Sequence, residues 1–188
     1  MRKITFLLIA VSTIAGILAS IHPASSQTDE AAAPIYGVKI PAGYRDWRMI
    51  SVATVGGSQN DLRVKLGNED AIKAYRESKA FPDGAIIARL AYTRVNSAED
   101  NKALQPILER LGLPPEQVAK LAAESFIAGP PTNVQFMVKD SKKYASTGGW
   151  GFAQFTNGKP DGEGVHKTCF GCHAPAKDRD FVFTRYAP

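Results

Sequence analysis

Apolar and charged side chains alternate at residues 62–66 with the period of a half-buried β-strand. The same alternation, or enrichment in apolar and β-branched residues, marks further segments of the chain. Strands are predicted at 85–95, 134–138, 150–156 and 181–184, and a helical turn leading into a strand at 44–55. These patterns predict a fold dominated by an antiparallel sheet.

Apolar stripes with helical spacing predict the helices. Asn68 is a good N-cap for a helix over 69–79, and the Pro82-Asp83-Gly84 turn leads from that helix into the next strand. Ser97 with Asp100 resembles a capping box that opens two helices. Their stripes consist of Leu104, Ile107, Leu108 and Leu111 in the first, and Val118, Leu121, Ala122 and Phe126 in the second.

We expect these two helices to form an insertion over 97–131, closed by Gly129-Pro130-Pro131. Asp140 and Ser141 are predicted to cap one further short helical segment. The predicted fold class is α+β, an antiparallel sheet with several helices in a single domain over 44–188, preceded by an extended lead-in at 27–43.

The first 26 residues have the pattern of a secretory signal peptide. Arg2 and Lys3 precede an apolar run, and small residues at 24–26 offer a cleavage site. The alternative, a retained membrane anchor, needs about 20 apolar residues, and the run at 4–19 is shorter. We therefore expect an exported protein, periplasmic in a bacterium, with no membrane anchor.

Removing Arg2 and Lys3 lowers the net charge from +5 to +3 (5 − 2 = 3). This small surplus is spread along the chain without a basic run, so nucleic acid is not an expected partner. It is compatible with an acidic redox partner.

Both cysteines of the chain lie in one motif, Cys169-Phe170-Gly171-Cys172-His173. C-x-x-C-H is the attachment signature of c-type haem. The two thiols join the vinyl groups of the macrocycle, and the adjoining histidine ligates the iron. The motif predicts one covalent haem c on Cys169 and Cys172, with His173 as proximal ligand.

Three other readings of these residues remain open. A redox-active dithiol favours a strand before the motif and a helix after it, whereas 157–168 is predicted to be a glycine-rich loop. A zinc site would use His166 together with the two cysteines and His173, although adjacent ligands rarely share a tetrahedral site. A structural disulfide would leave His173 without a role.

A second axial ligand is not evident. Met49 and Met137 lie in predicted strands, where a core or sheet-face role is favoured over iron ligation. His166 is too close to His173 along the chain to reach the opposite haem face, and we expect it at the surface or near a propionate. An open distal face favours binding of small ligands over electron shuttling alone.

Beyond the haem motif, several ordered stretches resemble the cytochrome P-460 family, which includes the cytochromes c′-beta. The stretches are Tyr44-Arg45-Asp46-Trp47, Leu62-Arg63-Val64, Phe81-Pro82-Asp83-Gly84, residues 138–145, Trp150-Gly151-Phe152 and Phe181-Val182-Phe183-Thr184. The resemblance covers nearly the whole chain after the signal peptide. It implies an exported monohaem protein, commonly a homodimer, with a five-coordinate iron ligated by histidine.

The resemblance also implies roles for residues of the distal pocket. The hydroxylamine-oxidising members carry a lysine cross-linked to the porphyrin, and this position corresponds here to Arg89. Because an arginine side chain stays protonated, it is a poor nucleophile and cannot readily form the cross-link. Lys73 and Lys79 are the alternatives considered for that link. Arg63 matches a pocket arginine of the enzymes, and Phe81 matches a phenylalanine that caps the distal face or packs in the core.

The leading hypothesis is a ligand-binding cytochrome without the cross-link, which binds nitric oxide or a similar molecule. The second is an enzyme that oxidises hydroxylamine, with Arg63 or Arg89 orienting the substrate, and passes electrons to another cytochrome. The third is a simple electron carrier, which the missing methionine ligand disfavours.

Overall fold

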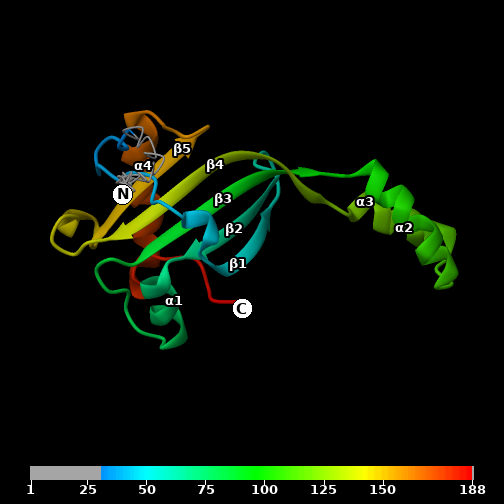
Figure 1. The fold of residues 1–188 in the computed structure, drawn as a ribbon, viewed down its shortest axis with the longest axis horizontal. Coiled ribbons are helices and arrows are strands. Elements are labelled where there is room, and N and C mark those ends of the chain that lie inside the picture. Colours follow the sequence, from blue (N-terminus) through cyan, green and yellow to red (C-terminus); the bar gives the residue numbers. More distant parts are fainter. Residues whose placement is uncertain (1–30, 188) are drawn as a thin grey trace, which may run out of the picture.

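One six-stranded antiparallel sheet, in the order β1-β2-β3-β4-β5-β6, organises residues 31–187, which are the residues that the computed structural model describes. The strands are β1 (Arg48–Val55), β2 (Asp61–Gly67), β3 (Ile86–Val95), β4 (Ile127–Lys139), β5 (Trp150–Thr156) and β6 (Lys159–Pro160). Each strand pairs with its neighbour in sequence, so the sheet is a simple meander (Figure 1). The predicted α+β class is confirmed. The predicted signal peptide, 1–26, lies outside the described residues.

Four α-helices and three 3₁₀-helices precede, connect or follow the described strands. The α-helices are α1 (Glu69–Arg76), α2 (Ala98–Arg110), α3 (Pro115–Glu124) and α4 (Glu163–His173). The 3₁₀-helices are η1 (Tyr44–Asp46), η2 (Ala145–Thr147) and η3 (Ala174–Arg179). No helix within residues 31–187 is both long and apolar enough to cross a membrane.

The sheet buries apolar side chains on both faces. One face packs Leu90, Phe136 and Phe155 against the segment that contains Ala33 and Val38. The other face packs Ile87, Met137, Trp150 and Phe152 against α1, α4 and the C-terminal segment. Because side chains alternate along each strand, Phe136 and Met137 belong to different clusters.

Local capping follows the sequence closely. Asn68 Oδ1 accepts from the Ala71 amide at 3.0 Å, and Asn68 Nδ2 donates to the Gly84 carbonyl, which ties the start of α1 to the turn before β3. Ser97 Oγ accepts from the Asp100 amide at the start of α2. Asp140 accepts from the amides of residues 142 and 143. Ser141 instead donates its hydroxyl to Asp83 at 2.7 Å.

The predicted insertion is a helical hairpin that projects from the sheet on the long ends of β3 and β4 (Figure 1). Its predicted boundary was too long, because β4 already begins at Ile127 and Gly129-Pro130-Pro131 is part of that strand. Proline is tolerated in this strand extension, where β4 pairs with β3 through register shifts. The helix predicted over 69–79 likewise ends earlier, at Arg76.

Two predictions about the C-terminal region were wrong. Residues 157–168 were expected to be a loop, but they contain β6 and the first half of α4. Glycine weakens a helix, but α4 is anchored by packing on β5. Residues 181–184 alternate as expected, with Val182 buried and Phe183 half exposed. However, they form no strand: Asp180 and Phe181 both adopt positive φ, and Val182 packs on the face of the sheet instead of pairing with one of its edges.

His166 is the anchor that packs α4 on the sheet, which corrects its predicted surface position. Its side chain is 0 % exposed. Nε2 accepts from the Gln154 amide of β5 at 3.1 Å, and Nδ1 lies 3.0 Å from the Gly162 carbonyl. Both ring nitrogens are therefore occupied by hydrogen bonds between β5 and the start of α4.

Replacing His166 by leucine should destabilise the protein, because the Gln154 amide then loses its acceptor in a buried position. We expect the free energy of unfolding, measured in urea, to fall by about 1–3 kcal/mol. The control is Lys167→Ala, which removes an exposed ion pair with Glu163 and should change stability by less than about 0.5 kcal/mol. Equal stability of His166→Leu and the wild type would contradict the anchoring role.

Candidate functional site

The C-terminal end of α4 brings Cys169, Cys172 and His173 together. Residues three and four apart on a helix lie on the same face, so this spacing presents two thiols and an imidazole to one side. Cys169 is half-buried and Cys172 is exposed, and the two are not joined to each other. The predicted motif residues therefore converge at one place.

The His173 imidazole is fixed by a hydrogen bond to the backbone. Its Nδ1 lies 2.8 Å from the Phe181 carbonyl oxygen. Since a carbonyl can only accept, Nδ1 carries the proton and Nε2 keeps its lone pair. Burial lowers the pKa of His173, and the bond to Phe181 partly offsets this effect. A neutral imidazole oriented through its second nitrogen is the usual state of a metal-ligating histidine.

Asp180 fixes the position of the backbone at Phe181, whose carbonyl oxygen accepts the hydrogen bond from His173. Its Oδ1 lies 2.6 Å from Lys139 Nζ, in an ion pair whose side chains are only 22 % and 11 % exposed. Its carbonyl accepts from Trp150 Nε1 at 2.8 Å. Asp180 and Phe181 both have positive φ, a backbone conformation that is unfavourable for residues other than glycine. The contacts of Asp180 with β4 and β5 stabilise this turn.

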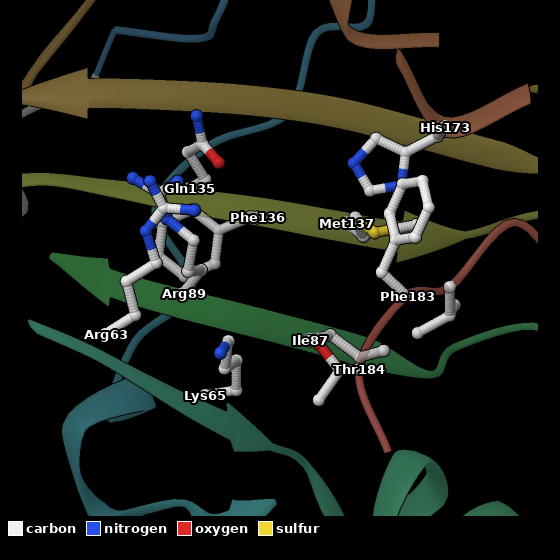
Figure 2. Close-up of a pocket in the computed structure, with 11 residues that line it drawn as sticks. Arg63, Lys65, Ile87, Arg89, Gln135, Phe136, Met137, His173, Phe183 and Thr184 are labelled. Carbon is white, nitrogen blue, oxygen red and sulfur yellow. The ribbon is translucent and has the colours of Figure 1, made fainter. Parts of the chain in front are cut away.

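Nε2 of His173 faces a cavity of about 340 Å³ above the sheet. Figure 2 shows His173 and Phe183 at one end of this cavity, with Arg63, Arg89 and Gln135 at the other. The lining consists of Arg63, Lys65, Ile87, Arg89, Gln135, Phe136, Met137, His173, Val182, Phe183 and Thr184. We call this the α4 pocket.

The strand register explains why the α4 pocket has an apolar end and a polar end. Ile87, Met137 and Phe152 lie side by side on β3, β4 and β5, and the Phe152 ring centroid is 5.0 Å from that of His173. Two residues further along the same face, each strand contributes a polar residue. That row consists of Lys65, Arg89, Gln135 and Gln154.

The polar end is strongly cationic. Arg63 Nε pairs with Asp61 at 2.9 Å, and Arg89 Nη2 donates to Asn133 at 2.9 Å. Burial, together with the Arg63 charge, lowers the pKa of Arg89 to about 10. Burial and the charges of Arg63 and Arg89 also lower the pKa of Lys65. With a pKa of about 10, Arg89 stays positively charged at neutral pH.

The structure brings Arg63, Arg89 and His173 to one pocket, as their candidate roles require. Phe81 does not line it. Its ring packs instead at 4.9 Å from Tyr75 and 5.5 Å from Trp150, centroid to centroid.

The two methionines lie in strands as predicted, and the lysine in the pocket is one that the sequence did not single out. Lys73 and Lys79 are absent from the lining of the α4 pocket, whereas Lys65 is part of it. Sequence reasoning missed Lys65, although its signal was present: it lies two residues after Arg63 and therefore on the same face of the strand. Met137 lines the pocket, and Met49 is 47 % exposed on β1.

The competing readings of the motif fit this geometry less well. His166 has both nitrogens engaged away from the cysteines, and no group of three or more His, Cys, Asp or Glu within the described residues is arranged to hold a metal ion. Burial and the neighbouring Cys172 raise the pKa of the Cys169 thiol. A redox-active dithiol instead needs a lowered thiol pKa, commonly at a helix N-terminus.

The residues of the α4 pocket fit a haem. Neither Cys169 nor Cys172 is among the lining residues, but both lie on the same helix face as His173, whose unprotonated nitrogen faces a cavity with an apolar floor. The Arg89 Nε at the far end is buried without a hydrogen-bond partner, so the cavity is incomplete without a further group. Fold and site together define a haem-binding class of protein.

Comparison with protein families places this chain among such proteins. Residues 41–184 match the family Cytochrome P460, and the chain belongs to that family. Family membership implies a haem cofactor. Among curated proteins, none matches this chain in a sequence search.

Asp180→Ala should weaken both the fold and the His173 position. The substitution leaves Lys139 buried without its ion partner, and breaking such a pair costs about 3–5 kcal/mol of unfolding free energy. Denaturant unfolding of the haem-loaded protein measures this loss.

Asp178→Ala is the matched control, because Asp178 is an exposed acid two positions earlier. We expect less than about 0.5 kcal/mol from it. If Asp180→Ala unfolds at the same denaturant concentration as Asp178→Ala, Asp180 does not hold this turn.

Proposed function

We propose that this protein is an exported c-type cytochrome that holds one covalent haem and binds a small ligand such as nitric oxide. Cys169 and Cys172 would anchor the macrocycle, and His173 would ligate the iron from one side. The observation that carries this proposal is the His173 imidazole, bound through Nδ1 to Phe181 and facing the α4 pocket with Nε2.

When bound, the haem supplies an iron that takes up diatomic ligands and changes oxidation state. The chain's own residues set the conditions for this chemistry. Phe152 and Phe183 restrict the rotation of the His173 ring, with ring centroids at 5.0 Å and 5.5 Å. The apolar row excludes water near the imidazole, while the polar row leaves hydrogen-bond donors at the other end.

The geometry favours an open second face over a second protein ligand. Met137 is the one thioether in the lining of the α4 pocket. Figure 2 shows it beside His173 and Phe183, on the His173 side of the pocket rather than beside Arg63 and Arg89. This position supports ligand binding over a simple electron carrier.

Export to the periplasm is part of the proposal. It is supported by the signal-peptide pattern of residues 1–26 and by the haem motif, because c-type haem is attached outside the cytoplasm.

Maturation in a host that attaches c-type haem tests the proposal. The haem of the wild type should stay with the chain after denaturation and extraction with acidified acetone, and the ferrous spectrum should shift when nitric oxide is added. The double variant Cys169→Ser/Cys172→Ser should release its haem, because no thioether bond remains. Thr168→Ala, an exposed neighbour on α4, is the control and should retain it. Extraction of the haem from the wild type, or a spectrum indifferent to nitric oxide, would contradict the proposal.

A second candidate function is oxidation of hydroxylamine, with electrons passed to another cytochrome. Lys65 favours it, because this residue faces Arg89 across β2 and β3 and brings an amine into the pocket. The oxidising relatives implied by the resemblance carry a lysine linked to the porphyrin. A haem spectrum that stays altered after denaturation would support this candidate, and an ordinary haem c spectrum would exclude the link.

We also propose that two copies of the chain associate through the α2–α3 hairpin. Ile107 and Leu111 are 46 % and 70 % exposed, and Val118 is the one buried residue that α2 and α3 contribute. Helices of this length need tertiary packing for stability. The first turn of α2 is acidic and its last turn carries Arg110, so an antiparallel pair of α2 helices places opposite charges together.

The double variant Ile107→Glu/Leu111→Glu should therefore be monomeric in sedimentation experiments at concentrations where the wild type is a dimer. Gln117→Glu, an exposed polar position on α3, adds a similar charge without removing apolar surface and should leave the dimer intact. A monomeric wild type, or a double variant that still dimerises, would rule out this interface.

A further inference from the structure

The polar end of the α4 pocket holds more positive charge than the described residues around it neutralise. Arg63, Lys65 and Arg89 all line the pocket, and its lining contains no carboxylate among the described residues. The acid whose charge acts on Lys65 and Arg89 is Asp61, and it is already bound by Arg63 Nε at 2.9 Å and 3.0 Å. Lys65 and Arg89 therefore form no direct ion pair with an acid among the described residues.

Arg89 and Lys65 also have hydrogen-bond donors without an acceptor among the described residues. Arg89 donates from Nη2 to Asn133, but its Nε is buried without an acceptor. Lys65 Nζ makes no hydrogen bond or ion pair with any residue that the structure describes. A buried donor without an acceptor destabilises a fold unless a further group binds to it.

The strand register brings these like charges close together. Lys65 lies directly opposite Arg89 on the neighbouring strand, and like charges at such positions repel. Arg63 lies two residues before Lys65 on the same face. Repulsion and missing acceptors would both be relieved by one negatively charged group.

We propose that the polar end of the α4 pocket is an anion subsite, in which Lys65 and Arg89 bind a carboxylate or small oxyanion. The guanidinium fork presents two donors to paired oxygens, and the ammonium adds a point charge. This inference rests on the proposed function, because the α4 pocket is taken to be the haem cavity. The bound anion would be either a propionate group of the haem or a free anion that enters the pocket from solution.

Binding of nitrite to the haem-loaded protein, followed in the absorption spectrum, separates the two sources. A free-anion subsite predicts that nitrite affinity falls about tenfold in both Lys65→Gln and Arg89→Gln, because each variant loses one charge-assisted contact. Affinity for nitric oxide should fall less than affinity for nitrite in either variant, since nitric oxide is neutral and forms no ion pair with these side chains. Lys65→Arg should restore most of the nitrite affinity.

A propionate in the subsite predicts a different result. Nitrite affinity is then unchanged, but the pH dependence of the haem reduction potential moves. A carboxylate beside a cation has a lowered pKa, so its titration shifts to higher pH by about one unit in Lys65→Gln. Arg48→Gln removes an exposed positive charge outside the pocket and should alter neither quantity.

The anion subsite is overturned if both variants fold and load haem, and change neither the ratio of nitrite affinity to nitric oxide affinity nor this titration. Failure of the proposed function is distinguishable, since it appears as a wild-type spectrum that does not respond to nitric oxide.

Discussion

The hydrogen bond from His173 Nδ1 to the Phe181 carbonyl decides which ring nitrogen faces the α4 pocket. That bond exists only because Asp180 and Phe181 turn the chain at positive φ, and the turn is tied to β4 and β5 through Lys139 and Trp150. The C-terminal segment, which forms no strand, is thus as important to the site as the sheet. A metal-ligating histidine needs such a partner to fix its tautomer and orientation.

The second determinant is the two-residue period of the strands. On one face of β3 and β4, this period places an apolar row beside His173 and a polar row two residues further along each strand. A single sheet therefore provides both the apolar floor and the charged end of the α4 pocket. The opposite face is free to build a conventional core around Phe136 and Phe155.

Sequence reasoning predicted the sheet, the capping of α1 and α2 and the haem motif, because these depend on local periodicity and on residue types at fixed spacing. It failed where tertiary contacts override local preference. The glycines before Cys169 indicated a loop, yet the buried His166 holds that stretch as a helix against β5. Residues 181–184 alternate like a strand, but no described strand pairs with them. Lys65 was overlooked because its role depends on the residue opposite it, Arg89, rather than on its own neighbours.

In the proposed cytochrome, one histidine ligates the iron and leaves the opposite face open. Resonance Raman and absorption spectra of the ferrous, haem-loaded protein without added ligand test it most directly. We expect a five-coordinate, high-spin iron with one imidazole ligand, and loss of that ligand in His173→Ala. A six-coordinate, low-spin spectrum that becomes five-coordinate in Met137→Leu would show that the protein itself closes the second face, and would contradict the account.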